Sequence, residues 1–286
     1  MNLTFWGVRG SIPVPGAGTL RWGGNSSCVA LTVPGAPPLL LDCGTGARAL
    51  GQRLLAAGER DVHVLFTHLH IDHVFGLPFF GPLYVPGGRV ELGVPAVSPV
   101  DAETRLGRFM NGIYHPVRLG EVPGRVAFTP IRPGPAFGMG PWELRSVGLN
   151  HPGGALGYRV TLGGRSVVYL TDTAPLARPG EGVVDGRRPP ALEQKVLDLL
   201  AGADACIFDT MFTQAQYMVR QSWGHSYPEY AVALCRAAGV RRLFLYHHAP
   251  ELDDDALDAL DAHWMGVREG GLTVRLAREG ESHDLT

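Results

Sequence analysis

The chain reads Thr67-His68-Leu69-His70-Ile71-Asp72-His73 directly after the β-type run of residues 62–66, so three histidines and one aspartate fall within six positions. Neutral imidazole and carboxylate groups are the side chains with which proteins hold Zn²⁺, Mn²⁺ or Fe²⁺. A solvated histidine-rich loop is the alternative interpretation. The density of ligand-type side chains favours a metal site.

The spacing within this loop indicates how the side chains are directed. If the strand ends near Thr67, His68 and His70 leave it on the same side, because side chains alternate along a strand. Asp72 and His73 then fall in the turn and first helical residues that follow. Four ligands from one short loop suit two adjacent metal ions better than one, so a second set of ligands must come from elsewhere.

Length and composition indicate one domain without a basic surface. A chain of 286 residues with 45% hydrophobic residues can bury a large core, and no boundary is visible, so we expect a single domain over residues 1–286. The segment 178–190, with its prolines and glycines, is interpreted as a surface loop. The net charge of −2 disfavours a long nucleic acid as substrate, although bound divalent metals would make a pocket positive.

Cysteine usage and the N-terminus bear on the compartment. The four cysteines are far apart in sequence, and we interpret them as buried thiols; they are Cys28, Cys43, Cys206 and Cys235. The N-terminal residues lack the charged and apolar regions of a signal peptide, and no apolar stretch approaches the length of a membrane span. We therefore expect a cytoplasmic protein without a membrane partner.

Apolar periodicity predicts both strands and helices. Strand-like runs cover residues 3–8, 28–33, 39–43, 62–66, 126–131, 142–149, 157–162, 166–170, 205–208, 243–246 and 272–276. Helical patterns cover residues 47–57, 101–111, 191–201, 228–238 and 253–264. This order favours an α/β fold with a mixed sheet or with two sheets packed together.

Several of the predicted strands end at a single polar residue. These residues are Asp42, His151, Asp172, Asp209 and His247. Each alone is typical of a turn or a helix cap. Together with the histidine-rich loop, the repeated ending favours metal ligands held at the edge of a sheet.

These features resemble the metallo-β-lactamase superfamily, whose ligands are a His-x-His-x-Asp-His loop, a lone His, a lone Asp and a final His, in that order. The resemblance implies a four-layer αββα sandwich of two mixed β-sheets. It implies two divalent metal ions, most readily zinc or manganese, with iron also accommodated. Metal one would be held by His68, His70 and His151, and metal two by Asp72, His73 and His247, with Asp172 bridging both. Asp42 looks like the family's early aspartate, which orients a ligand imidazole.

The expected chemistry is hydrolysis by an activated water. The resemblance implies that two metals with Asp72 among their ligands share a bridging hydroxide, without a covalent enzyme intermediate. The segments around His225 and Asp209 resemble those of the phosphodiesterase branch, which includes tRNase Z and phosphoribosyl cyclic phosphate phosphodiesterases. His225 would stabilise the phosphorane or protonate the leaving alkoxide, with Asp209 fixing its tautomer. The alternative is that His225 only caps the helix that begins near Pro228.

Several further residues are candidates for contacts with the substrate or the metals. Arg9, in a glycine-containing N-terminal segment similar to that of small-substrate members, is a candidate phosphate contact, and a surface turn explains it equally well. Ser226 is a further candidate substrate residue. Of the adjacent pair His247 and His248, alignment on the preceding strand favours His247 as the last ligand, with His248 beside the site or on the surface.

The substrate is expected to be small. The tRNase Z resemblance would require a long tRNA-gripping arm between the lone His and the lone Asp, yet His151 and Asp172 are joined by a short hairpin-like segment. We therefore favour a cyclic phosphate or cyclic nucleotide, with nucleic acid disfavoured. A thioester or lactone hydrolase, a tRNA-processing nuclease and a non-catalytic binding protein are the alternatives, and a homodimer is compatible with the sequence.

Overall fold

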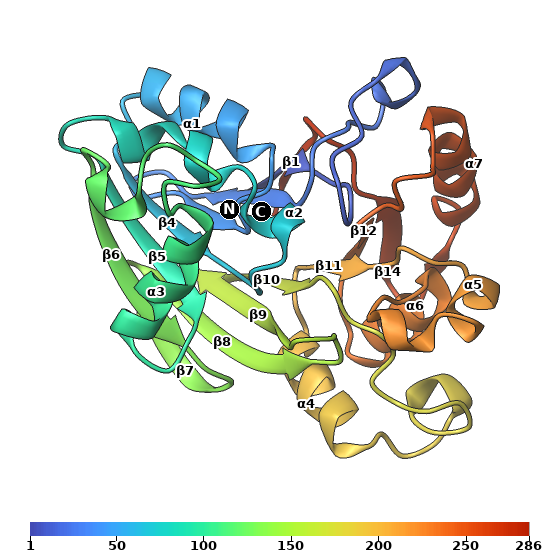
Figure 1. Ribbon diagram of the computed structural model, residues 1–286. Helices are drawn as coiled ribbons and strands as arrows, with labels where there is room; N and C mark the ends of the chain where they lie inside the picture. The colour runs from blue at the N-terminus through green and yellow to red at the C-terminus, as the bar shows by residue number, and fades with distance from the viewer. Residues whose placement is uncertain (286) are drawn as a thin grey trace.

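Alternating apolar residues build the strands of two β-sheets. Along β8 (Trp142–Leu149), Trp142 and Leu144 are buried whereas Glu143 and Arg145 are exposed, as expected for a strand with one covered face. The computed structural model describes residues 1–285 and contains a seven-stranded and an eight-stranded sheet. The two sheets pack face to face (Figure 1).

The first sheet has the strand order β15-β1-β2-β3-β4-β5-β6. Its strands are β1 (Asn2–Gly7), β2 (Cys28–Thr32), β3 (Leu39–Leu41), β4 (Asp61–Leu65), β5 (Arg89–Pro95), β6 (Arg125–Ile131) and β15 (Ser282–Asp284). The second sheet has the order β13-β14-β12-β11-β10-β9-β8-β7. Besides β8, its strands are β7 (Gly134–Met139), β9 (Ala155–Leu162), β10 (Arg165–Leu170), β11 (Ala205–Asp209), β12 (Arg242–Tyr246), β13 (Arg268–Glu269) and β14 (Leu272–Leu276).

The inner faces of the two sheets share one apolar core. Phe5, Leu31 and Leu65 of the first sheet are completely buried together with Tyr158 and Ile207 of the second. Removal of apolar surface from water stabilises the folded state by about 25 cal/mol per Å². This layer therefore fixes how the two sheets, and the side chains at their common edge, lie relative to one another.

Helices cover the outer faces of both sheets. α1 (Ala47–Ala56) and α3 (Pro99–Phe109) share a buried apolar cluster with the first sheet. α4 (Ala191–Leu200), α6 (Pro228–Ala237) and α7 (Asp254–Trp264) do the same on the second sheet (Figure 1). The predicted αββα sandwich is confirmed. Two short helices, α2 (Ile71–Val74) and α5 (Gln214–Met218), lie in the loops around the candidate site.

The predicted helices and strands match the structure to within two residues at each end, but four strands were not predicted: β5, β7, β13 and β15. β5 is the most important of these, because it lies between β4 and β6. Arg89 and Glu91 alternate with its apolar residues, so the segment does not form an apolar run. Glu91 is accommodated because it accepts a hydrogen bond from Thr129 Oγ1 (2.6 Å) and pairs with His63 Nδ1 (3.0 Å).

Parallel pairing brings the carboxyl ends of the site-bearing strands to one edge. β3 pairs in parallel with β4, and β10, β11 and β12 pair in parallel in the second sheet. The residues that follow β3, β10 and β12 are Asp42, Asp172 and His247, and each has a positive φ, of 58°, 55° and 64°. The chain thus turns sharply as it leaves these strands, at the positions where the sequence places polar side chains.

Other expectations concern segments away from this edge. The four cysteines are free and buried, as predicted. Segment 178–190 is a mostly exposed loop with one short 3-10 turn, η5 (Val183–Asp185). No helix within residues 1–285 combines the length and apolar character needed to cross a membrane.

Candidate metal centre

Three overlapping groups of imidazole and carboxylate side chains meet at the common edge of the sheets, and two of them contain the proposed metal ligands. The remaining group, Asp172, Asp209, His225 and His247, contains the His225–Asp209 pair described below. The first group contains His68, His70, His151 and Asp172. Asp172 Oδ2 lies 3.7 Å from His68 Nε2 and 3.6 Å from His151 Nε2. His70 Nδ1 lies 3.1 Å from His151 Nε2. The ligand-type atoms of this group therefore converge on one small volume.

The second group lies beside the first and contains Asp72, His73 and His247. Asp72 Oδ2 is 3.2 Å from His73 Nε2 and 3.2 Å from His247 Nε2. The other oxygen of Asp172, Oδ1, lies 3.2 Å from His73 Nε2 and 3.1 Å from His247 Nε2. Asp172 thus directs one carboxylate oxygen to each group, which is the arrangement that the resemblance implies.

The chemistry of this donor set fits bound divalent metal. The Nε2 atoms of His68 and His73 are buried and have no hydrogen-bond partner within residues 1–285, although buried polar atoms almost always have one. Burial and the neighbouring His73 lower the pKa of His68 well below its usual value, so its ring is neutral and its lone pair is available. Burial opposes ionisation of Asp72, but His73 and His247 hold its pKa well below the usual range. The cluster can therefore hold metal.

Asp42 orients His73 from behind. It is completely buried, and its Oδ2 lies 2.7 Å from His73 Nδ1. Thr67 donates its backbone N–H to Asp42 Oδ1 (2.8 Å), and Tyr169 donates its hydroxyl to Oδ2 (3.1 Å). An acceptor at Nδ1 keeps the proton there and leaves the Nε2 lone pair directed to the second group.

His225 and Asp209 form a hydrogen-bonded pair beside both groups. His225 Nδ1 lies 2.9 Å from Asp209 Oδ2, and its ring stacks on that of His247 with a centroid separation of 5.1 Å. Asp209 accepts the backbone N–H groups of Thr173 and Met211, both at 3.1 Å. Burial opposes protonation of His225, but Asp209 outweighs it and raises the pKa to about 9. His225 does not cap α6, whose N-cap residue has no side-chain cap hydrogen bond.

Arg9 does not have the surroundings expected of a phosphate contact. Its side chain is completely buried, and the guanidinium donates Nε to Gly23 O (2.8 Å) and Nη1 to Leu252 O (2.5 Å) and Ala249 O (3.4 Å). Arg9 therefore joins the N-terminal loop to the loop after β12. The carbonyl acceptors occupy Nε and Nη1, whereas the buried Nη2 has no hydrogen-bond partner among the described residues. These contacts favour a structural role for Arg9 over the expected phosphate contact.

The structure separates the two adjacent histidines and locates Ser226. His248 is buried and donates Nε2–H to Ala277 O (2.7 Å), so its ring is absent from both groups, in which His247 takes part. Burial lowers the pKa of His248 to about 4. Ser226 accepts the Phe212 backbone N–H through its carbonyl, while its buried hydroxyl has no partner within the described residues.

Ser11 is a contact that the sequence did not predict. Its backbone N–H donates to Asp72 Oδ2 (2.9 Å), and its φ is 64°. Ser11 contributes a main-chain group, which any residue type would supply, so side-chain patterns give no signal for it. Its side chain is exposed beside the second group.

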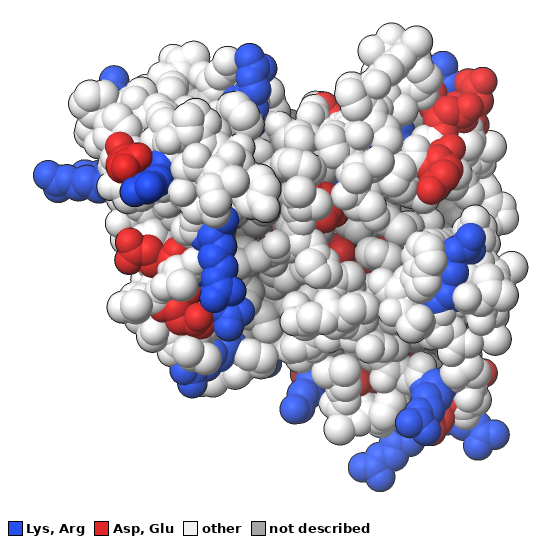
Figure 2. Space-filling view, in the orientation of Figure 1, with Lys and Arg blue, Asp and Glu red and all other residues white. Residues whose placement is uncertain are grey.

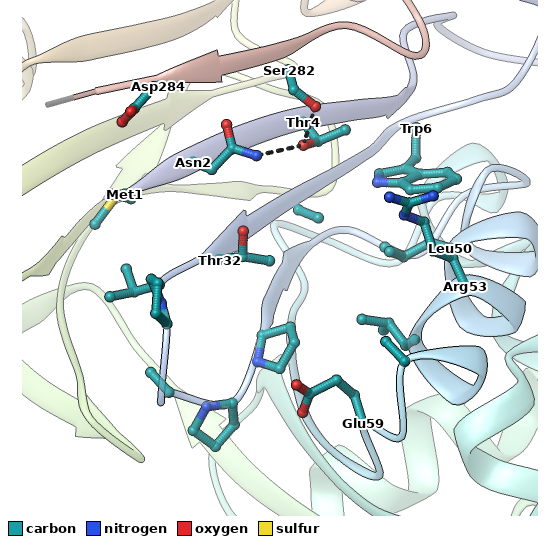
Figure 3. A pocket seen from close by; sticks show the side chains of 18 of the residues that line it. Met1, Asn2, Thr4, Trp6, Thr32, Leu50, Arg53, Glu59, Ser282 and Asp284 are labelled. Atoms are coloured by element: carbon teal, nitrogen blue, oxygen red, sulfur yellow. Dashed lines mark hydrogen bonds between the residues drawn. The ribbon is translucent and has the colours of Figure 1, made fainter.

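Cavity size alone does not locate this site. A cavity of about 1120 Å³ lies beside β1, β2, β15 and α1, with Trp6, Arg53 and Glu59 in its lining and none of the proposed ligands (Figure 3). None of the groups of metal-type side chains found within residues 1–285 lies there. Figure 2 shows instead a hollow on the face where the sheet edges meet, with acidic atoms inside it and basic side chains along one side.

Comparison with known proteins agrees with this geometry. Residues 38–248, which carry all seven proposed ligands, match the model of the β-lactamase superfamily domain. The chain belongs to the metallo-β-lactamase superfamily. It is 28% identical to a ribonuclease Z of Synechococcus sp. (strain WH7803) over 87% of this chain and 85% of that protein.

Two solved structures show the same fold. The metallo-β-lactamase fold protein YhfI of Bacillus subtilis superimposes with a TM-score of 0.69 at 19% identity, over 99% of this chain and 98% of YhfI. A diphosphatase of the PhnP family gives a TM-score of 0.66 at 19% identity, over 99% of this chain and 97% of the diphosphatase. This protein is thus a hydrolase of the metallo-β-lactamase superfamily with a His and Asp cluster able to hold metal.

Proposed function

We propose that this metallo-β-lactamase superfamily hydrolase is a dinuclear phosphodiesterase that acts on a small phosphodiester, such as a cyclic phosphate or cyclic nucleotide. The observation that carries the proposal is the His225–Asp209 pair beside the two ligand groups, with 2.9 Å between Nδ1 and Oδ2. His68, His70, His151 and Asp172 would hold one metal, and Asp72, His73, His247 and Asp172 the other. Zinc or manganese suits this set best, and iron is also compatible.

Bound divalent cations supply a water of lowered pKa and offset the negative charge that develops on the phosphoryl oxygens. The chain's own residues supply the remaining functions. Asp209 accepts the Nδ1 proton of His225, so the second proton of the imidazolium sits on Nε2, on the opposite side of the ring. His225 can then donate that proton to the departing alkoxide. Ser11 N–H and Asp42 fix the orientations of Asp72 and His73.

The leaving group separates this proposal from thioester or lactone hydrolysis. An alkoxide leaves slowly unless it is protonated, whereas a thiolate leaves readily without a proton donor. A buried imidazole held by a carboxylate therefore has a task in phosphodiester cleavage and none in thioester cleavage.

The test compares wild type with His225→Ala on an alkyl cyclic phosphate, bis-p-nitrophenyl phosphate and a thioester. We expect kcat on the alkyl ester to fall by about 10²- to 10⁴-fold. The loss on the nitrophenyl ester should be smaller, because nitrophenolate leaves without protonation. His115→Ala, which removes a histidine that belongs to none of the groups, is the control. Metal-loaded wild type that cleaves only the thioester, or an unchanged His225→Ala rate on the alkyl ester, would overturn the proposal.

An RNA phosphodiester is a second candidate, because the relative from Synechococcus is named ribonuclease Z and is matched over 85% of its length. The turn Gly163-Gly164 joins β9 to β10 directly, so the segment between His151 and Asp172 holds no inserted arm. The absence of an arm in this segment and the net charge of −2 both favour the small substrate over RNA. Cleavage of a 3′-extended tRNA precursor at a rate exceeding that for cyclic phosphates would reverse the preference.

A further inference from the structure

A second cavity, of about 810 Å³, adjoins the candidate metal centre through His225. Its volume falls in the range of small-molecule sites. Ser11 and Met211 border it near the metal centre, and its walls carry aromatic and aliphatic side chains from two separate segments. The wall residues that the argument uses are Phe212, Arg220, Trp223, Leu252, Leu260 and Trp264.

One wall combines aromatic rings with an unpaired cation. The centroids of Phe212 and Trp223 are 6.3 Å apart, and the Arg220 guanidinium carbon lies 5.6 Å from each centroid. Among the side chains that the structure describes, which exclude residues 268, 269 and 286, no carboxylate forms an ion pair with Arg220. Trp223 is 60% exposed although its ring is largely apolar. An exposed indole beside a guanidinium without a counter-charge is typical of a ligand-binding surface.

This wall is continuous with the proposed proton donor. The Phe212 ring meets the His225 ring edge to face, with a centroid separation of 5.7 Å and an interplanar angle of 84°. A planar group that contacts Phe212 and Trp223 therefore lies next to His225. A phosphate joined to that group by a sugar can reach the metal centre.

The backbone holds Trp223 at a fixed place relative to the metal centre. His151 Nδ1 donates to Gly224 O (3.0 Å), so the residue next to Trp223 is bonded to a proposed ligand. Gly224 has a φ of 85°, and a Cβ there would lie 2.4 Å from His151 Nδ1. Only glycine allows this close approach.

The opposite wall is held by Arg9 and carries apolar side chains together with Glu251 and His263. The carbonyl groups of Ala249 and Leu252 accept the Arg9 guanidinium, which holds the loop that precedes α7. Leu252, Leu260 and Trp264 contribute the apolar lining from this side. The cavity is therefore bounded by a stacking wall and by a second, mainly apolar wall that includes the Trp264 ring, surroundings that suit a flat heterocycle.

We propose that this cavity binds the nucleobase of the substrate, so that the phosphodiesterase proposed above acts on a nucleoside phosphodiester. The inference rests on that proposed function for the reacting phosphate, but the binding of the base stands on its own contacts. Bases stack on aromatic side chains, and an arginine beside the stack adds cation–π attraction. An acyl chain would contact the apolar wall but would offer the Arg220 guanidinium neither a π-system nor a negative charge.

The experiment measures binding by isothermal titration calorimetry on the metal-loaded protein. Adenosine 5′-monophosphate is compared with ribose 5-phosphate, which has the same sugar and phosphate but no base. We expect the nucleotide to bind at least tenfold more tightly. Trp223→Ala should remove most of this preference and leave the affinity for ribose 5-phosphate unchanged, whereas Trp223→Phe should retain most of it. Trp6→Ala, in the distant cavity of Figure 3, is the matched control.

Equal affinity for the two probes, no binding of the nucleotide, or a preference that survives Trp223→Ala would overturn the inference. A parallel assay of adenosine 2′,3′-cyclic phosphate hydrolysis separates the two proposals. Base-dependent binding without hydrolysis would refute the phosphodiesterase proposal alone. Hydrolysis with a base preference unaffected by Trp223→Ala would refute the nucleobase site alone.

Discussion

Asp42, Asp172 and His247 share a left-handed backbone conformation that non-glycine residues adopt rarely. Such a conformation costs about 1–3 kcal/mol for each residue and persists only where the surroundings enforce it. Here the three residues follow three strands, and each side chain takes part in the contacts of the metal centre. The strained backbone after these three strands thus directs the polar side chains toward the candidate metal centre.

Asp42→Asn tests how far the carboxylate behind His73 supports metal binding. The amide has nearly the same shape, but it lacks the charge that holds the proton on His73 Nδ1. We expect metal affinity to fall by about 10- to 100-fold, measured by titration of the apo protein with Zn²⁺. Asp61→Asn removes an exposed ion pair with Arg89 and is the control. Equal metal affinity in Asp42→Asn and wild type would contradict this role.

Because the pKa of His248 is depressed, the stability of the folded protein should depend on pH. Its value of about 4 lies below the ordinary 6.5, so the unfolded chain binds the proton more readily than the folded one. Stability is therefore complete above pH 6.5 and falls as the pH drops toward 4, by up to about 3 kcal/mol. His248→Gln should lose less stability between pH 7.5 and 5 in urea unfolding. An identical pH dependence in both proteins would exclude this origin.

The sequence predicted every residue that the structure brings together in the two groups of proposed metal ligands, because four of them lie in one local motif and the others follow strands. It missed Ser11, whose contact is made by a backbone N–H. It assigned Arg9 to phosphate because a guanidinium beside glycines suits a phosphate and a set of carbonyl groups alike, and only the fold decides between them.

At the scale of elements, η6 (Gln221–Trp223) and the residue after it connect the aromatic wall to the metal centre. Gly224→Ala should displace His151, because the new Cβ would lie 2.4 Å from its Nδ1. We expect a larger loss of unfolding free energy than for Gly202→Ala, together with weaker metal binding. Gly202 also has a positive φ, of 61°, but an added Cβ there meets no atom within 4 Å.

Comparison of these two variants by urea unfolding and zinc titration separates backbone strain from steric displacement. Backbone strain alone predicts that the free energy of unfolding falls by about 1 kcal/mol at both positions. If Gly224→Ala behaved like Gly202→Ala in both measurements, the contact between this turn and His151 would contribute neither to stability nor to metal binding.

Elements with regular apolar periodicity were predictable, and the missed strands show why others were not. β5 carries charged residues that only its neighbours satisfy, as the Glu91 contacts with His63 and Thr129 show. β7 contains glycine and proline and lies at the edge of its sheet, where missing or weak pairing is tolerated. Tertiary context rather than local preference makes these segments strands.

The candidate metal centre lies where the two sheets meet at their common edge. The histidine-rich loop follows β4 of the first sheet, whereas Asp172 and His247 follow β10 and β12 of the second. Metal bound there would link the two sheets, and its removal would leave buried carboxylates close together without that link. We expect a chelator to lower Tm by several degrees and Zn²⁺ to restore it, since ligand at about 1,000 times Kd stabilises the native state by about 4 kcal/mol.

Differential scanning calorimetry with and without chelator measures this effect. His70→Ala, which removes one member of the first group, should show a smaller change on chelation than wild type. An unchanged Tm in wild type would contradict a structural contribution of the metals. The order of the predicted strands and helices allowed one mixed sheet or two packed sheets, and the resemblance to the metallo-β-lactamase superfamily implied the sandwich that the structure shows.

The buried state of all four cysteines has a practical consequence for spectroscopy. Burial raises the pKa of the Cys28, Cys43 and Cys206 thiols, so they are poor nucleophiles toward maleimide reagents. A single cysteine introduced at the exposed position of Glu251, which lines the same cavity as Trp223, would therefore be the one readily labelled thiol. A fluorophore or spin label attached there would report on occupancy of the neighbouring cavity without any background substitution of the native cysteines.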